Sequence, residues 1–151
     1  MIEINNATSS PVDKNYLKRI SERILKSESA SWRKKEKDLS IALVGPGQIR
    51  KLNKIYRKKN RPTDVLSFSY GRSSEIVICI SEVRKNAKKY HLPFKKELNR
   101  VLIHGILHVL GYDHKAGSKG KKLMEKKENY YFRKENYSFR KENYSLQYAK
   151  N

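Results

Sequence analysis

The chain has 151 residues, which is enough for one domain with a buried core. Its 35 lysines and arginines against 15 aspartates and glutamates give a formal net charge of +20. Such an excess favours a polyanionic partner, although charge alone specifies no site and a solvated basic surface is the alternative. No apolar run approaches the ~20 residues of a membrane span, so we expect no membrane partner. The first residues lack a positive start followed by an apolar stretch, so we expect no secretory signal.

The first half of the chain alternates between strand and helix patterns. Apolar residues at every second position predict a short strand at residues 2–4. Ser10, followed by proline, reads as the cap of a helix that ends before residue 27, and Trp32 is expected to anchor the core after it. A second strand is predicted at residues 39–44.

A second helix follows and ends at Pro62, because proline does not continue a helix. Its expected apolar side consists of Ile49, Leu52, Ile55 and Tyr56. Its remaining surface and end are very basic, with Arg50, Lys51, Lys54, Arg57, Lys58, Lys59 and Arg61.

Two strands in tight succession, residues 65–70 and 75–80, precede a third helix that Ser81 is expected to cap. The single cysteine, Cys79, is expected to be a buried strand residue without a disulfide partner, which favours a reducing cytoplasm. The order of elements predicts an α/β (α+β) class: one domain with a mixed four-stranded sheet packed with helices.

Three of the four histidines lie within eleven residues of a fourth predicted helix and the turn after it. His104 and His108 are four apart, so they share one helix face. Gly111 suits a left-handed helix end, after which the chain can bring His114 back over the pair. Three imidazoles with one open position are the arrangement of a catalytic zinc site. The alternative to a metal ligand, for any lone histidine, is a core residue whose hydrogen bonds are satisfied within the protein.

The spacing of these histidines equals that of metzincin peptidases, except that Gly105 stands where their glutamate base would be. A zinc ion at this position would still acidify water. The missing glutamate argues against proteolysis. It favours a hydrolytic site in which another group assists the reaction.

The end of the chain repeats a seven-residue unit that begins at Glu128 and again at Glu135. We divide the chain into a domain at residues 1–127 and a repetitive Tyr/Lys/Arg-rich tail at residues 128–151. Aromatic residues interleaved with lysine and arginine suit base stacking. The favoured alternative is a repeat expansion without a role, poorly ordered or partly helical.

The segment from His104 to His114, HGILHVLGYDH, resembles the signature of the YbeY endoribonucleases, and residues 52–68 resemble a second block of that family. The resemblance implies a single-strand-specific, metal-dependent endoribonuclease in 16S rRNA 3′-end maturation and 70S ribosome quality control. It implies one zinc ion per chain on His104, His108 and His114, and rRNA, with the small ribosomal subunit, as the partner. Arg57 matches an arginine implicated in activity.

The candidate catalytic residues are therefore Arg57, whose guanidinium matches phosphate oxygens, and the zinc ligand His104. The general base is left open: Asp113 more often orients a ligand imidazole or belongs to the turn, and Asp64 also suits the entry to the next strand. Two other functions stay open: a divergent metzincin-like metallopeptidase, and a non-catalytic basic ribosome-binding factor with structural zinc. The second needs a fourth ligand, for which His91 is the spare histidine.

Overall fold

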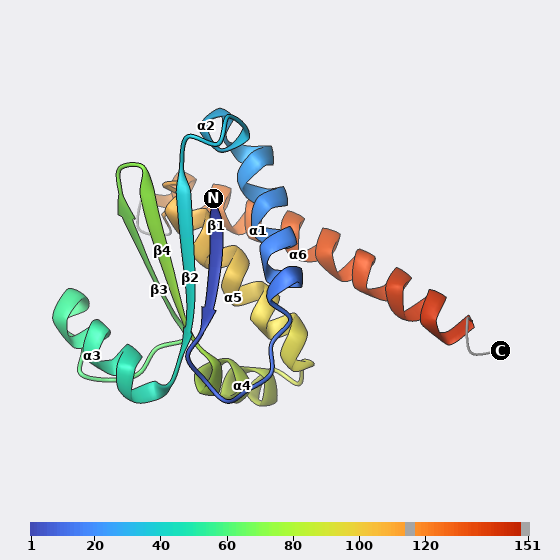
Figure 1. Cartoon of the computed structure of the whole chain (residues 1–151), viewed down its shortest axis with the longest axis horizontal. Helices are drawn as coiled ribbons and strands as arrows, with labels where there is room; N and C mark the ends of the chain where they lie inside the picture. The colour runs from blue at the N-terminus through green and yellow to red at the C-terminus, as the bar shows by residue number, and fades with distance from the viewer. Residues whose placement is uncertain (114–116, 149–151) are drawn as a thin grey trace.

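The computed structural model describes residues 1–113 and 117–148, with the side chains of residues 136–148 left out. A four-stranded sheet stands in front of a group of helices, while α3 projects from one side of it (Figure 1). The strands are β1 (Ile2–Asn6), β2 (Asp38–Val44), β3 (Val65–Tyr70) and β4 (Ser73–Cys79). The helices are α1 (Lys14–Glu28), α2 (Ala30–Arg33), α3 (Pro46–Arg57), α4 (Ile80–Lys89), α5 (Phe94–Val109) and α6 (Gly117–Tyr148).

The sheet has the order β1-β2-β4-β3. Strands β1, β2 and β4 run parallel, and β3 pairs antiparallel with β4 at the edge. The turn between β3 and β4 contains Gly71 with φ +68, a conformation that glycine adopts without strain. The predicted α+β domain with a mixed four-stranded sheet is thereby confirmed.

The main core fills the space between one face of the sheet and helices α1, α4 and α5. Its fully buried members include Leu17 and Ile24 of α1, Ile41 of β2 and Leu102 of α5. Trp32 of α2 is buried at its edge, as expected. Burial of a large aliphatic side chain stabilises the fold by about 2 kcal/mol, so this layer holds α5 firmly against the sheet.

The second face of the sheet is covered only in part. A smaller cluster joins Ile49 of α3 to Leu66, Val77 and Cys79 of the strands, and Cys79 is buried as predicted. The expected apolar side of α3 is wrong in its second half, because Ile55 is 69% and Tyr56 58% exposed. Helical periodicity identifies the apolar side of a helix, but it does not show how far other elements cover that side.

Two helix starts differ from the predicted ones. Helix α1 is capped by Asp13, whose Oδ1 accepts a hydrogen bond from the Tyr16 N–H at 3.0 Å, rather than by Ser10. Helix α4 begins at Ile80 with Cys79 at the capping position, one residue before the predicted strand end, so Ser81 lies inside the helix. An aspartate side chain caps a helix N-terminus as well as a serine side chain does.

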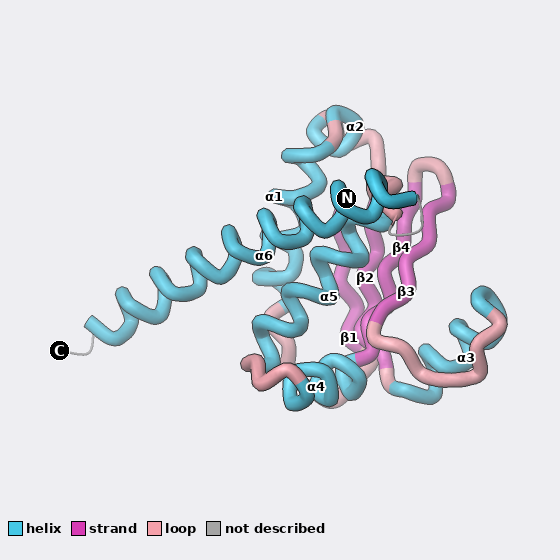
Figure 2. Tube along the Cα trace, turned by 180° about the vertical axis from the view of Figure 1, so that it is seen from behind, coloured by secondary structure: helices cyan, strands magenta, loops and turns pink. Residues whose placement is uncertain are grey.

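Helix α6 passes across α5 on the side away from the sheet (Figure 2). Met124 is fully buried, and two residues of the repeats, Tyr131 and Glu135, are 5% and 3% exposed. Arg23 of α1 pairs with Glu135 at 3.2 Å. The helix continues through residue 127, whereas the division of the chain at that residue stays a prediction. Within the described residues no helix is both long and apolar enough to cross a membrane.

Candidate metal centre

Helix α5 brings His104 and His108 together. Residues 101–107 are buried except for His104, and His108 is half-buried as well. The ring centroids lie 4.6 Å apart with the planes at 76°, and the two Nε2 atoms are 3.1 Å apart. The predicted i, i+4 pair is therefore a convergent pair of nitrogens on the side of α5 that faces α6.

The 3.1 Å between the Nε2 atoms suits a shared metal ion. Two histidine ligands of a tetrahedral zinc ion, each at about 2.0–2.1 Å, hold their nitrogens about 3.3 Å apart. Imidazole donors suit zinc and several other transition metals. Among the described residues, no three His, Cys, Asp or Glu side chains form a group that could hold a metal. The predicted third ligand, His114, lies outside the described residues.

Gly105 faces the opposite way, toward the sheet. Its carbonyl oxygen accepts a hydrogen bond from Ser67 Oγ at 3.1 Å. A Cβ atom at position 105 would lie 3.0 Å from Ile76 Cγ2 and 3.3 Å from Val65 Cγ2. A glutamate at this position would therefore point into β3 and β4 instead of toward the histidines. The close packing of α5 on the sheet explains the departure from the metzincin pattern.

Glu128 of α6 contacts the other side of the His104 ring, with 3.2 Å between its Oε1 and Nδ1. A carboxylate at Nδ1 fixes the orientation of a ligand imidazole and makes Nε2 the metal-binding nitrogen. Glu128 was not among the residues predicted from the sequence, where Asp113 was expected to orient a ligand imidazole instead. Asp113 is exposed in the segment that follows α5.

The segment that leads to His114 is anchored by Glu28 at the end of α1. Gly111 turns the chain with φ +97, in the predicted left-handed conformation. The Tyr112 hydroxyl then donates to Glu28 Oε2 at 2.8 Å, and Lys127 Nζ of α6 donates to Oε1 at 3.0 Å. The Tyr131 hydroxyl donates to the same carboxylate. One carboxylate thus joins α1, α6 and the turn after α5.

These contacts shift the pKa of Glu28 and the pKa of Tyr131 in opposite directions. Burial alone would raise the pKa of Glu28, but the hydrogen bonds from Tyr131, Tyr112 and Lys127 outweigh it and hold the pKa below 4.5. Burial, and then the hydrogen bond to Glu28, raise the pKa of Tyr131. Glu28 is therefore ionised at neutral pH and the tyrosine is protonated, which is the state that the hydrogen bonds require.

Arg57 lies elsewhere, at the exposed end of α3, and its side chain makes no hydrogen bond or ion pair with the described residues. The loop after it folds back, because Asn53 Nδ2 donates to the Arg61 carbonyl at 2.8 Å and Lys58 adopts a left-handed φ of +58. Arg57 and His104 are thus not brought into contact. The Asp64 side chain is held in place, because its Oδ2 accepts a hydrogen bond from Asn86 Nδ2 at 3.2 Å.

His91 is exposed in the turn before α5, with φ +54. Phe94 begins α5, and a helix rises about 1.5 Å per residue, which separates that end from His104 by about 15 Å. His91 is therefore not positioned to close the site as a fourth ligand.

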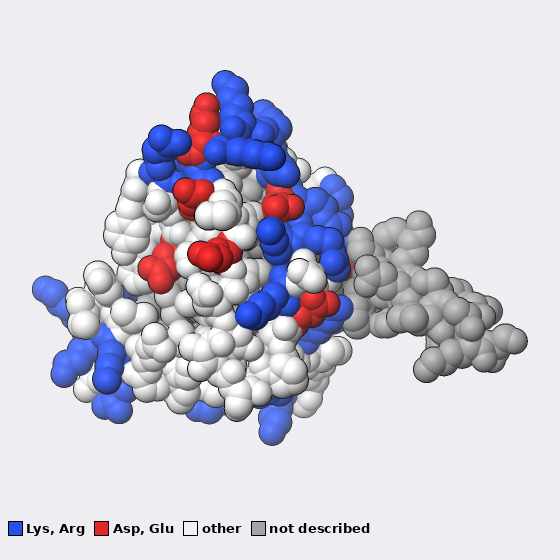
Figure 3. Space-filling view, viewed as in Figure 1, with Lys and Arg blue, Asp and Glu red and all other residues white. Residues whose placement is uncertain are grey.

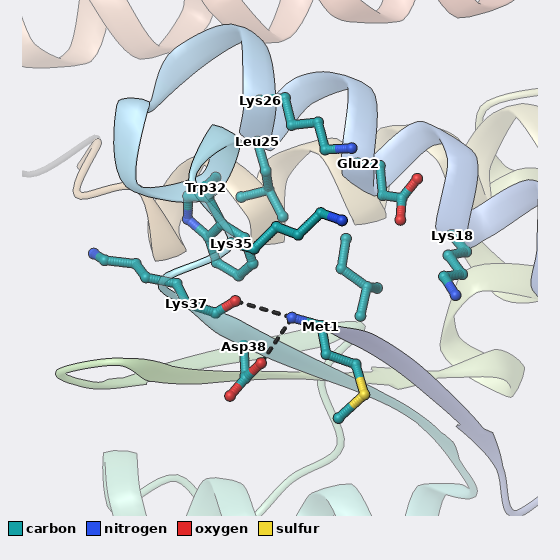
Figure 4. A pocket seen from close by; sticks show the side chains of 10 residues that line it. Met1, Lys18, Glu22, Leu25, Lys26, Trp32, Lys35, Lys37 and Asp38 are labelled. Carbon is teal, nitrogen blue, oxygen red and sulfur yellow. Dashed lines mark hydrogen bonds and ion pairs between the residues drawn. The ribbon is translucent and has the colours of Figure 1, made fainter.

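A pocket of about 420 Å³ lies away from the histidines, between α1 and the N-terminal ends of β1 and β2 (Figure 4). The Met1 ammonium group donates to Asp38 Oδ1 at 2.7 Å and to the Lys37 carbonyl at 3.0 Å inside it. Its lining contains lysines and Glu22 but no histidine. The hollow is therefore separate from the candidate metal centre.

The fold and the histidine pair define a class: an α+β domain with a candidate transition-metal site on a helix that packs against a mixed sheet. A family model described as "YbeY: Endoribonuclease YbeY" matches residues 3–136. The chain belongs to the YbeY family.

Known members support this assignment. The "Endoribonuclease YbeY" of Thermotoga neapolitana is 40% identical over 126 residues, which cover 78% of this chain and 79% of the relative. That of Petrotoga mobilis is 35% identical over 133 residues, which cover 85% and 90%. The solution structure of a Thermotoga maritima protein superposes with a TM-score of 0.68 at 34% identity, covering 94% of this chain and 93% of that one.

Proposed function

We propose that this protein is a metal-dependent endoribonuclease that cleaves single-stranded RNA at the histidine pair of α5. The observation that carries the proposal is the 3.1 Å separation of His104 Nε2 and His108 Nε2 on the face of α5 away from the sheet. Its YbeY family membership supplies the reaction class, cleavage of RNA phosphodiester bonds. The net charge of +20 supports a polyanionic substrate.

The residues that would hold the metal are His104, His108 and His114, and zinc is the ion we propose. When bound, such an ion makes water acidic and polarises a phosphoryl oxygen. The protein contributes orientation: Glu128 holds the His104 ring through Nδ1 at 3.2 Å, and Glu28 anchors the turn that precedes His114 through Tyr112.

Arg57 is our candidate for charge stabilisation at phosphorus. A guanidinium offers a planar set of donors that matches two phosphate oxygens at once. Its exposed position on the last turn of α3 leaves the side chain accessible to an RNA strand. The other cations of α3 would bind neighbouring phosphates and position the strand.

As biological substrate we propose rRNA, with the small ribosomal subunit as partner: 16S rRNA 3′-end maturation and 70S ribosome quality control. This assignment rests on the family membership and the basic charge. The compartment we propose is the cytoplasm, which agrees with a free, buried Cys79.

The two other functions are less well supported. A metallopeptidase of metzincin type would need a base beside the metal, but position 105 faces Ile76 and Val65 of the sheet. A ribosome-binding factor with structural zinc would need a fourth protein ligand, and His91 lies at the opposite end of α5.

The test is cleavage of a single-stranded RNA oligomer by purified wild-type protein and matched variants. His104→Ala is expected to lower the cleavage rate by at least about a hundredfold, whereas His91→Ala, at an exposed histidine, leaves it unchanged. Arg57→Ala is expected to lower it by about a hundredfold with metal content retained, whereas Arg19→Ala on α1 has little effect. Full cleavage by a folded His104→Ala variant, or cleavage of casein instead of RNA by the wild type, would refute the proposal.

A further inference from the structure

Three aromatic rings of α3 and β3 form a row on the sheet face opposite α5. The Tyr56 and Phe68 ring centroids are 4.9 Å apart at 60°, and those of Phe68 and Tyr70 are 6.4 Å apart at 14°. Tyr56 and Tyr70 are 58% and 59% exposed, and Phe68 is half-buried between them. We call Tyr56, Phe68 and Tyr70 the aromatic ladder.

Packing explains only the inner ring of the ladder. Phe68 lies against the small cluster that contains Leu66 and Val77, so its inner side shields apolar surface. The two tyrosines at the ends remain mostly in water, where a large ring gains little from folding. Solvent-exposed aromatic rings in a row, of which two are nearly parallel, are the surface on which nucleic-acid bases stack.

The charge next to the ladder has one sign. Between Gly45 and Thr63 the sequence contains no aspartate or glutamate. The basic residues of this stretch are all exposed: Arg50, Lys51, Lys54, Arg57, Lys58, Lys59 and Arg61. Figure 3 shows lysine and arginine gathered at α3, apart from the larger basic group over α1 and α2. Arg57 follows Tyr56 directly in the chain, and Arg50, Lys51 and Lys54 precede it on the same helix.

The sheet on the other side of the ladder carries the opposite charge. Phe68 pairs with Glu75, Glu75 with Ser40, and Ser40 with Glu3, so the two glutamates lie in one row across the sheet with Phe68. Glu3 is exposed and Glu75 half-buried. Phosphates are repelled by this row and attracted to α3. A bound strand would therefore place its backbone on the α3 side and its bases over the rings.

We propose that the aromatic ladder stacks successive bases of single-stranded RNA while the cations of α3 bind its phosphates. The inference rests on the proposed function and adds to it how the substrate strand is held. It also gives a reason for selecting single strands, because bases in a duplex are already stacked on each other and cannot lie on the rings. A strand on the ladder places a phosphate beside Arg57.

Tyr70 is the residue to change, since it lies at one of the two exposed ends of the ladder. Equilibrium binding is measured by fluorescence polarisation with two labelled probes: a phosphorothioate single-stranded RNA oligomer, and an abasic oligomer of equal length that keeps the phosphates. The variants are Tyr70→Ala, Tyr70→Phe and, as a matched control, Tyr90→Ala, because Tyr90 is a 50% exposed tyrosine away from α3. Circular dichroism checks that each variant is folded.

Tyr70→Ala is expected to weaken binding of the RNA oligomer by about tenfold and to leave binding of the abasic oligomer unchanged. Tyr70→Phe and Tyr90→Ala are expected to bind both probes as the wild type does. Unchanged RNA binding by Tyr70→Ala, or an equal loss of binding with both probes, would refute the proposal that bases stack on the aromatic ladder. If one of these two results is found but the wild-type protein cleaves RNA, the proposed function stands and only the base-stacking proposal is refuted. A wild type that neither binds nor cleaves RNA refutes both.

Discussion

The histidine pair on α5 and the basic end of α3 are built in different surroundings. Residues 101–107 around His104 are buried between the sheet and neighbouring helices, whereas Ile55, Tyr56 and Arg57 on α3 stand in solvent. Metal coordination needs nitrogens fixed within a few tenths of an ångström, which a packed helix supplies. A long polyanion needs accessible side chains instead, which an exposed helix supplies. In the proposed function, the metal ligands therefore lie on a packed helix and the residues that contact the RNA phosphates lie on an exposed one.

The packed region is the one that mutation can break most severely. Gly105→Glu places a carboxylate against Ile76 and Val65, and is expected to lower the free energy of unfolding by about 4 kcal/mol or more through steric overlap and a buried charge. Urea unfolding measures this. Gly47→Glu on α3, where a Cβ meets nothing within 4 Å, is the matched control and should change stability little. Equal stabilities of the two variants would contradict the tight packing described for α5.

The anchor at Glu28 gives a pH-dependent prediction of intermediate size. Because its folded pKa is lowered below 4.5, Glu28 stabilises the protein at neutral pH, and this contribution is lost as the pH falls through the folded pKa. Glu28→Gln is expected to lower the free energy of unfolding at pH 7 by about 2 kcal/mol and to weaken its acid dependence. Unfolding curves across acid and neutral pH measure both effects. Parallel pH profiles for variant and wild type would show that the carboxylate is not the anchor.

The smallest expected effect concerns the orientation of His104. Glu128→Gln is expected to weaken zinc binding by about tenfold with little change in stability, because the ring loses a charged partner at Nδ1. Glu125→Gln, at an exposed residue of the same helix, is the control. Competition with a chromophoric chelator measures both affinities. If Glu125→Gln and Glu128→Gln bind zinc as tightly as the wild type, the contact with Nδ1 has no role in the site.

These two regions also differ in how far the sequence predicts them. The pairing of His104 with His108 depends only on helical spacing, so it could be predicted locally. The exposure of Ile55 and Tyr56 could not, because periodicity identifies a side of the helix and not what covers it. Glu128 was missed because it approaches His104 from α6, 24 residues away, and only the packing of α6 on α5 brings it there. The mixed sheet was predictable from the order of strands and helices.

His104 and His108 on α5 are proposed to bind the metal that cleavage requires. The most direct measurement is RNA cleavage by protein stripped with a chelator and then titrated with zinc, for wild type and His108→Ala. Wild type is expected to regain cleavage as it binds one zinc ion per chain, whereas folded His108→Ala is expected neither to retain the ion nor to regain cleavage. Full recovery of the variant, or undiminished cleavage by stripped wild type, would contradict it.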